Sequence, residues 1–264
     1  MHDELTIRLI FFVGTLTIIA LWEIIAPRRI LNENKLNRWS TNLILVVINT
    51  AMVRFFLPFL PAGLSLIAQD RGWGILNIMT MPLWINILLA FIAFDFIIYL
   101  QHMLFHFLPV LWRLHRMHHT DLDIDVTTGN RFHPIEIIIS SGIKLAAVIL
   151  IGPPSVAIVA FEIALNSSSQ FNHGNIRIPD KLDQWLRHII VTPDMHRVHH
   201  SVILYETNSN FGFNLPWWDR LCGTYRQQPE KGHQLMTIGL KEFRNSTKLT
   251  LPNLLIQPFI RKPL

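Results

Sequence analysis

The chain has thirteen histidines, and eight of them fall into three clusters with helical spacing. Neighbouring members lie one, three or four residues apart, so on a helix their imidazoles would lie on one side. Imidazole binds Zn, Fe, Cu and Ni, and one such ion takes about four to six ligands. Eight converging histidines therefore predict a site for more than one metal ion. The clusters are His102 and His106; His115, His118 and His119; and His196, His199 and His200.

A structural role for these histidines is the alternative, and it has to be weighed cluster by cluster. An isolated H-x-x-x-H pair is often incidental. The H-x-x-H-H unit is a stronger indication, because stacked imidazoles are difficult to keep buried and uncharged near neutral pH. This unit occurs twice. Most helical di-iron proteins use Glu-x-x-His spacing, which the clusters lack, so the site would consist almost entirely of histidine. We favour a pair of iron ions.

The composition predicts a membrane protein. Half of the residues are hydrophobic, only 16% are charged, and the mean hydropathy is +0.33. A net charge of +5 could suggest nucleic-acid binding, but Lys and Arg are scattered beside apolar runs and form no basic stripe. Attraction to anionic lipid headgroups explains the charge better. One cysteine excludes an intramolecular disulfide framework and a Cys-rich metal site.

Apolar stretches divide the chain into candidate membrane helices. The second stretch contains Arg54, Pro58 and Pro61, so we expect a kink or a re-entrant turn there. The last two stretches are joined by Gly-Pro-Pro-Ser at 152–155, which predicts a helical hairpin. The stretches are 5–26, 42–68, 82–100, 135–151 and 156–165.

Basic residues set the orientation. Four cations follow the first stretch, which places that loop in the cytoplasm by the positive-inside rule. Counting spans from there puts 101–134 and the chain beyond Ser167 on the same side. Both H-x-x-H-H units would then face the cytosol. The cations are Arg28, Arg29, Lys35 and Arg38.

These observations predict an all-α integral membrane protein with about four to five transmembrane helices, the last two forming a hairpin. A cytosolic helical cap, beginning near residue 175, would hold the histidine-rich dimetal site. We interpret 1–264 as a single membrane oxidase domain. Within it, 1–82 would form the N-terminal spans, 83–226 the histidine-motif catalytic core and 227–264 a C-terminal tail.

The motifs resemble the fatty acid hydroxylase/sterol desaturase superfamily over residues 90–226. That superfamily comprises membrane-bound non-haem di-iron enzymes that use O2 to hydroxylate or desaturate lipids. The resemblance rests on the order of the motifs as well as on their content. They are H-x-x-x-H from His102, L-W-R-x-H-R-x-H-H from Leu111, R-F-H-P-x-E from Arg131, N-H-x-N-x-x-x-P from Asn172, T-P-x-x-H-R-x-H-H from Thr192 and N-F-G-x-x-x-P-x-W-D-x-x-x-G-T-Y from Asn210.

The resemblance makes the eight clustered histidines iron ligands and adds His173 as a ninth. It implies no catalytic side chain apart from the metal ligands. His133 matches a family position, and we expect it to orient a loop or close the site, with a role as a further ligand as the alternative. Because ligand imidazoles usually donate their other N–H to a polar group, nearby polar residues are candidates for that role. They are Asp95, His133, Asn172, Asp194, Asn210 and Asp219, each of which could instead cap a helix or form a turn.

Some charged residues lie outside the motifs or beside the ligands. Lys144 falls in the middle of the fourth stretch and requires a partner, for which Glu162 is a better candidate than Glu136. The arginines next to the clusters could neutralise a lipid phosphate or form a solvated face. These are Arg113, Arg116 and Arg197.

The function implied by the resemblance is oxidation of a C–H bond in a fatty acyl or sterol-like lipid. It implies two Fe ions, which Zn can replace in purified protein, with O2 as cosubstrate. The chain lacks a G-x-G-x-x-G fingerprint and a C-x-x-C set, so electrons would come from a separate ferredoxin or cytochrome b5 type donor with its reductase. The enzyme would lie in a bacterial inner membrane or the endoplasmic reticulum, and would bind no nucleic acid.

Other classes of function are less consistent with the sequence. A membrane metal-binding or transport protein would place its ligands near the bilayer midplane on broken helices, whereas these histidines lie beyond the apolar stretches. A zinc hydrolase is a weaker alternative, because no H-E-x-x-H motif occurs.

Overall fold

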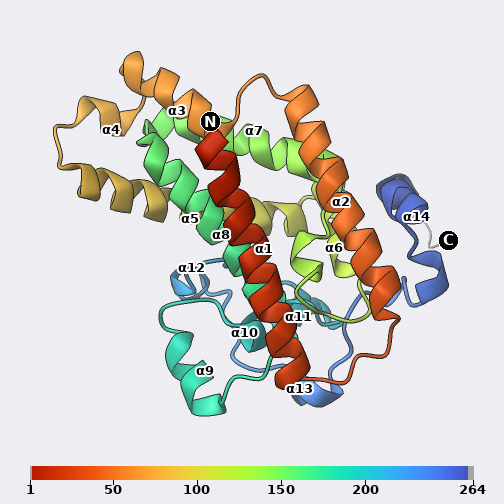
Figure 1. Ribbon diagram of the computed structural model, residues 1–264. Coiled ribbons are helices and arrows are strands. Elements are labelled where there is room, and N and C mark those ends of the chain that lie inside the picture. The colour runs from red at the N-terminus through yellow and green to blue at the C-terminus, as the bar shows by residue number, and fades with distance from the viewer. Residues whose placement is uncertain (1, 261–264) are drawn as a thin grey trace.

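The computed structural model describes residues 2–260 and is helical throughout (Figure 1). Over these residues it contains α-helices and short 3-10 helices but no β-strand, only two isolated bridges. The longest helices form an elongated bundle, and most of the short helices that follow residue 175 gather at one end of it. The all-α fold class is therefore confirmed. The long helices are α1 (His2–Ile25), α2 (Lys35–Phe56), α5 (Leu83–Phe107), α7 (Pro134–Ile151) and α8 (Ser155–His173).

Four helical stretches within residues 2–260 are long and apolar enough to cross a membrane. The second comprises α2, α3 (Pro61–Asp70) and α4 (Ile75–Ile78) with the breaks between them. The number lies at the lower end of the four to five that we predicted. α8 does not qualify, because its second half is polar. The stretches are Glu4–Ile25, Lys35–Ile78, Leu83–Phe107 and Pro134–Ile151.

Proline and glycine produce the breaks that the sequence indicated. α2 ends at Phe56, just before Pro58, and α3 begins at Pro61, which occupies the first helical turn. α7 ends at Gly152, which has a left-handed backbone with φ of 66°. A Cβ at Gly152 would lie 2.3 Å from the carbonyl oxygen of Trp73, so the hairpin between α7 and α8 requires glycine here.

α8 corrects one boundary of the sequence analysis. The predicted arm ended at residue 165, but the helix continues to His173. Its second half runs N-S-S-S-Q-F-N-H, and most of these side chains are partly or fully buried against other elements. Propensity alone disfavours helix for Asn and Ser, so tertiary packing sustains these turns. The extension brings His173 to the end of a rigid helix.

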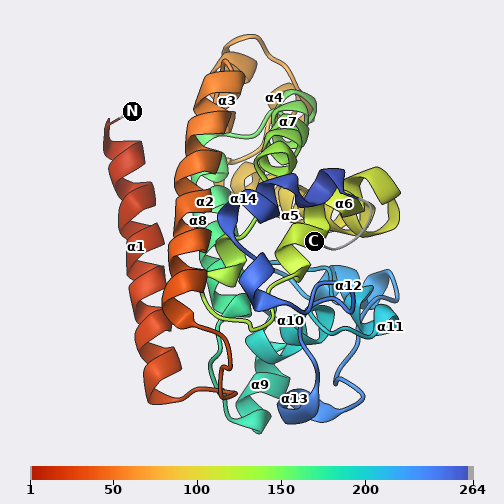
Figure 2. The ribbon, with the colours of Figure 1, turned by 90° about the vertical axis from the view of Figure 1, so that its right-hand side faces the viewer.

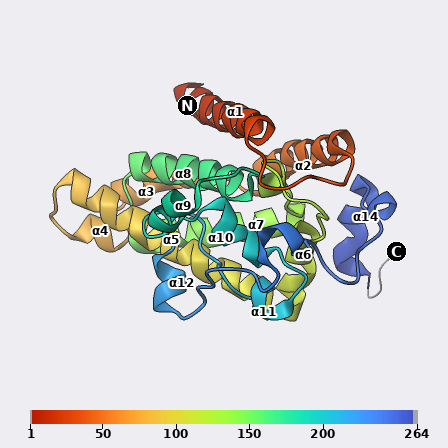
Figure 3. The same ribbon diagram turned by 90° about the horizontal axis from the view of Figure 1, so that it is seen from below.

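Short helices form a cap at one end of the bundle (Figures 2 and 3). α6 turns back from the end of α5 and η1 comes after it, whereas the other segments follow α8, as expected for the chain beyond residue 175. Turns and capping contacts connect them. They are α6 (Pro109–His119), η1 (Thr128–Asn130), α9 (Asp180–Leu186), α10 (Pro193–His199), α11 (Leu204–Thr207), α12 (Trp217–Leu221) and α13 (Gly232–Leu235). The C-terminal elements η2 (Ser246–Lys248), α14 (Leu251–Ile256) and η3 (Gln257–Phe259) lie instead at the side of the molecule, where α14 is beside α2 and α6 (Figures 1 and 3).

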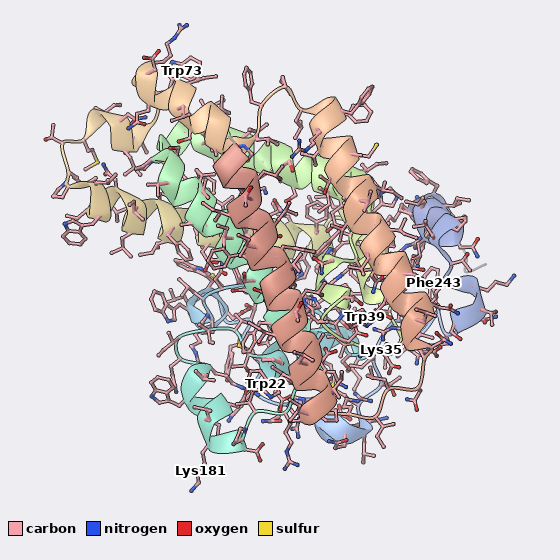
Figure 4. All side chains as sticks on the ribbon, viewed as in Figure 1. Trp22, Lys35, Trp39, Trp73, Lys181 and Phe243 are labelled. Carbon is pink, nitrogen blue, oxygen red and sulfur yellow. The ribbon has the colours of Figure 1, made fainter. Side chains whose placement is uncertain are left out.

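The bundle buries its core between α3, α5, α7 and α8, where Phe94 and Phe161 pack at a ring-centroid distance of 5.5 Å. α1 lies at the edge, beside α8 and next to α2 (Figure 3). Its outer side chains are large, apolar and exposed, as are those of α2 (Figure 4). Ile18 is 64% exposed and Val47 is 69% exposed. Such faces are suited to contact lipid.

A buried arginine holds the segment between α6 and α7 in place. Arg38 of α2 donates to Asp121 at 2.7 Å and to Asp125 at 2.6 Å. Glu23 of α1 accepts from the backbone N–H groups of Val126 at 2.7 Å and Asn175 at 2.8 Å. These contacts join the ends of α1, α2 and α8 to residues 121–128.

Candidate metal centre

All nine predicted ligands meet where the bundle joins the cap. α5 contributes His102 and His106, α8 contributes His173, and the other six come from α6 and α10 with its C-cap. Each of the nine is at most 8% exposed. α6 begins with Pro109 at its first turn, so the chain reverses immediately after α5. α10 begins with the Thr192 cap, whose hydroxyl accepts from the Met195 N–H at 3.3 Å.

The nine histidines divide into two groups. Within each group, one nitrogen of every ring lies within 4.8 Å of the others. This spacing could hold one metal ion per group. We call them the first group, which is His102, His106, His115, His119 and His199, and the second group, which is His118, His173, His196 and His200.

Helix geometry explains why each H-x-x-H-H unit is shared between the groups. Successive residues of an α-helix are about 100° apart around the helix axis. The side chain at i+4 therefore points about 40° to one side of the side chain at i, whereas the side chain at i+3 points about 60° to the other side. His115 and His119 accordingly enter the first group and His118 the second. In the other unit the assignment is reversed, with His196 and His200 in the second group and His199 in the first.

Most rings of the first group are oriented through Nδ1. His102 donates to the carbonyl oxygen of Phe211 at 2.7 Å, and His199 to that of Ser209 at 2.8 Å. His115 donates to the Glu136 carboxylate at 2.6 Å. In the second group, the Nδ1 of His173 donates to the carbonyl oxygen of Ser169 at 2.6 Å. An Nδ1–H held in this way leaves Nε2 unprotonated and available to a metal ion.

One contact tests whether a cation fits the first group. The Nε2 atoms of His102 and His115 lie 3.1 Å apart. A neutral imidazole carries one N–H, and both rings use theirs at Nδ1, so two lone pairs face each other. Two nitrogens that bind one ion at about 2.1 Å are expected about 3.0 to 3.4 Å apart. A metal ion between them would convert this repulsion into coordination.

The remaining ring nitrogens support the same interpretation. Among residues 2–260, several buried ring nitrogens have no hydrogen-bond partner, including Nε2 of His106, His119 and His199 and both nitrogens of His200. Such atoms are costly to bury unless something binds them. Burial, followed by the neighbouring imidazoles, lowers the pKa values of the predicted ligands in the cap, so these rings are neutral at physiological pH, as metal binding requires. They are His118, His119, His196, His199 and His200.

Comparison with known proteins places the chain in a family. Residues 87–224, which include all nine histidines, match the model of the family described as fatty acid hydroxylase. The chain belongs to the fatty acid hydroxylase family. No solved structure matches it.

Three similar proteins carry the names of lipid-modifying enzymes. Ornithine lipid hydroxylase of Rhizobium tropici is 31% identical over 148 residues, which is 56% of this chain and 44% of that protein. Human alkylglycerol monooxygenase is 32% identical over 142 residues, 54% of this chain and 31% of that protein. Methylsterol monooxygenase 2-2 of Arabidopsis thaliana is 25% identical over 187 residues, 69% of this chain and 67% of that protein. The matches therefore span less than half of the first two relatives.

The six polar candidates of this fatty acid hydroxylase family member bind backbone groups and other side chains. Within the described residues, none of the six is hydrogen-bonded to one of the nine rings. Asp219 accepts from the N–H groups of Phe211 at 2.8 Å and Gly212 at 2.9 Å. Asp95 accepts from Asn214 at 2.8 Å. Both therefore fix the loop that carries the Phe211 carbonyl.

The other four candidates also have roles in local structure. Asn210 has a left-handed backbone with φ of 52° and donates to the carbonyl oxygen of Met195 at 2.8 Å. Asn172 donates to the carbonyl oxygen of Phe213 at 3.3 Å. Asp194 pairs with Arg28 and Arg197, and His133 caps α7 and lies 3.1 Å from the Leu255 carbonyl oxygen. His133 belongs to neither metal group.

Apart from Asn208, whose Oδ1 lies 3.2 Å from the Nδ1 of His106, Glu136 is the side chain beside a ring that the sequence analysis missed. We considered it only as a weaker partner for Lys144, which instead pairs with Glu162 at 2.9 Å, the partner that we favoured. Glu136 opens α7 three residues after His133, in the R-F-H-P-x-E motif, and holds His115. The R-F-H-P-x-E motif could have identified Glu136 as a partner of a ligand ring, because it places a carboxylate at a fixed position in the first turn of a helix.

The three arginines beside the clusters do not form a solvated face. Arg197 is fully buried and pairs with Asp194. Arg113 and Arg116 donate to carbonyl oxygens of 257–260, at 2.6 Å for Pro258 and 2.5 Å for Gln257. Arg113 and Arg116 thus hold the C-terminal segment against α6, and nothing in these contacts supports a role in binding lipid phosphate. For Arg197 the lipid-phosphate role was wrong, because its side chain is buried and already paired.

A cavity of about 400 Å³ connects the bundle to the metal centre. It lies between α1, α2, α5, α7 and α8, and His102 and His115 form part of its inner wall. Aromatic and aliphatic side chains line much of the rest. These include Ile98, Phe105, Phe132, Ile137, Leu165 and Phe213.

Proposed function

We propose that this protein is a membrane-bound, O2-dependent lipid hydroxylase or desaturase with two iron ions. The observation that carries the proposal is a pair of adjoining histidine groups, the first of which lines one end of a largely apolar cavity through His102 and His115, in a bundle of helices long and apolar enough to span a membrane. Family membership supports the chemistry, and the names of the relatives support a lipid substrate.

The nine histidines would hold the two ions, five at one and four at the other. When bound, the iron pair supplies the ability to use O2 for oxidation of an unactivated C–H bond. The chain supplies orientation: Glu136 and the carbonyl groups of Phe211, Ser209 and Ser169 fix the ligand rings. The cavity walls would exclude water and hold the lipid carbon near the His102 and His115 end.

The substrate class that we propose is a fatty acyl or sterol-like lipid that enters from the bilayer. Turnover would need a separate electron donor of the ferredoxin or cytochrome b5 type with its reductase. We place the histidine site on the cytosolic face, because Arg28, Arg29, Lys35 and Arg38 follow α1 at the cap end. The membrane would be a bacterial inner membrane or the endoplasmic reticulum, and 1–264 would act as one domain.

Metal content and product analysis test the proposal. Protein produced with iron-57 and purified in mild detergent should contain two iron ions per chain, with a coupled pair in the Mössbauer spectrum. Reduced protein given membrane lipids and 18O2 should form an oxidised lipid, with the label retained if it hydroxylates.

Variants connect this activity to the two groups. His199→Ala removes a ligand of the first group and His118→Ala one of the second, so each should lose at least 100-fold in activity and part of the iron. His188→Ala is the control, because His188 is exposed and lies in neither group. Near-normal oxidation by well-folded His118→Ala and His199→Ala proteins would refute the proposal.

A further inference from the structure

The outer end of the cavity is charged, although it lies within the apolar bundle. Three cations and one anion line it, namely Arg8, Arg54, Lys144 and Glu162. At this end the wall includes Leu5 and Leu60, each 44% exposed, whereas His102 and His115 at the inner end are at most 3% exposed. The cavity therefore opens near the charged residues and closes at the metal centre.

Glu162 holds two of the cations together. Its Oε1 lies 2.9 Å from the Lys144 ammonium and its Oε2 lies 2.8 Å from the Arg8 guanidinium. Glu4 pairs with Arg8 at 2.9 Å but does not line the cavity. Arg54 is exposed and has no ion-pair partner among the described residues. Even when Glu4 is counted, three positive charges face two negative charges.

Ion pairing alone would explain how α1 is attached to α7 and α8. It does not explain a third, unpaired cation on the same wall, because charged side chains in membrane segments are costly and are usually paired or functional. One additional anionic group would balance the set. A carboxylate or phosphate is the group that Arg and Lys bind best.

A polar row on α7 connects this end to the metal centre. Glu136, Ser140 and Lys144 line the cavity at positions i, i+4 and i+8 of the helix. Eight residues of helix correspond to about 12 Å. Glu136, which contacts His115 directly, and Lys144 are therefore separated by about two turns along this helix.

We propose that the outer end of the cavity binds the single anionic group of an otherwise apolar lipid. This inference rests on the proposed function and specifies its substrate class. Arg54 and Lys144 contact the carboxylate or phosphate, and the hydrocarbon chain extends along the cavity to His102 and His115. The C–H bond to be oxidised then lies well away from the anionic group.

Binding of matched lipids tests this proposal without catalysis. The zinc-loaded full chain in detergent is titrated with a dansylated fatty acid, which is then displaced by hexadecanoate, hexadecyl phosphate or methyl hexadecanoate. Hexadecanoate and hexadecyl phosphate should each bind about tenfold more tightly than the neutral ester. Inorganic phosphate at millimolar concentration should not displace the probe, because the hydrocarbon chain supplies much of the affinity.

Two variants identify the groups responsible. Arg54→Gln and Lys144→Met should each reduce the preference for the anion by about threefold or more, while the affinity for the ester stays within twofold. Arg71→Gln is the matched control, since Arg71 is exposed and lies outside the cavity wall. Equal binding of acid and ester by the unmodified protein would overturn the proposal. A parallel loss of both affinities in the variants would also overturn it, since that indicates a structural role.

The outcomes separate this inference from the proposed function. Selective anion binding by a protein that contains no iron and oxidises no lipid would refute the function but retain the anion site. Lipid oxidation without any preference for the anionic lipids would support the proposed function and refute the anion site. In an active enzyme, oxidation at the carbon next to the carboxylate would contradict the proposed orientation.

Discussion

The contact between Glu136 and His115 leads to the sharpest prediction for the metal centre. The carboxylate oxygen lies 2.6 Å from Nδ1, and the two side chains are 6% and 2% exposed. Replacing such an outer partner of a metal ligand typically costs 10-fold to 100-fold in metal affinity, about 1.4 to 2.8 kcal/mol. Glu136→Gln retains an oxygen acceptor but loses the charge, so we expect about a tenfold loss. Glu136→Ala leaves Nδ1 without its acceptor and should lose about 100-fold.

The loss should be confined to one ion. His115 belongs to the first group, and within the described residues Glu136 is not hydrogen-bonded to any histidine of the second. Competition with a calibrated chelator should therefore show one weakened and one unchanged site. Asp183→Asn is the control, because Asp183 is a buried carboxylate that pairs with Arg187 away from the histidines. Two sites of unaltered affinity in Glu136→Ala would refute the proposed role.

Two further predictions concern how the elements are held in place. A Cβ at Gly129 would lie 2.4 Å from the carbonyl oxygen of Ser169, so Gly129→Ala should lower the free energy of unfolding by about 1 to 3 kcal/mol. Gly142→Ala is the control and should be neutral or stabilising, because a Cβ at Gly142 would have no atom within 4 Å. Denaturant titration in detergent compares the two variants, and equal stabilities would contradict the packing argument. Arg38→Met should lower the free energy of unfolding by about 3 to 5 kcal/mol, because it leaves Asp121 buried without its charge partner. The same denaturant titration measures this loss of stability. A loss below about 1 kcal/mol would refute the stabilising role of the Arg38–Asp121 pair.

Much of this fold could be predicted from local patterns. The apolar stretches correspond to the long helices, and Pro58 and Gly152 mark two of the breaks, because both effects act within a few residues. The polar end of α8 could not be predicted, since Asn and Ser disfavour helix unless packing compensates. Its extension to His173 depends on contacts with η1 and α10, which are distant in sequence.

The same distinction applies to the metal centre. The nine ring positions follow from spacing and motif, whereas their acceptors are largely backbone carbonyls, such as those of Phe211 and Ser209. Every residue has a carbonyl, so no residue type identifies which ones face a histidine. Polar side chains such as Asp95 and Asp219 were identified as part of the site, but they fix the loop that carries a carbonyl and do not contact a ring.

The division of each H-x-x-H-H unit has a consequence for how the two groups form. Each unit gives its i and i+4 rings to one group and its i+3 ring to the other, and α6 and α10 do so in opposite senses. Neither group can therefore be completed by a single segment, because residues about 80 positions apart in the sequence must meet first. α5 and α8, which supply the other three rings, belong to the core of the bundle, whereas α6 and α10 belong to the cap. Formation of the metal centre is thus coupled to packing of the cap onto the membrane bundle, and binding of the first ion would favour the geometry of the second.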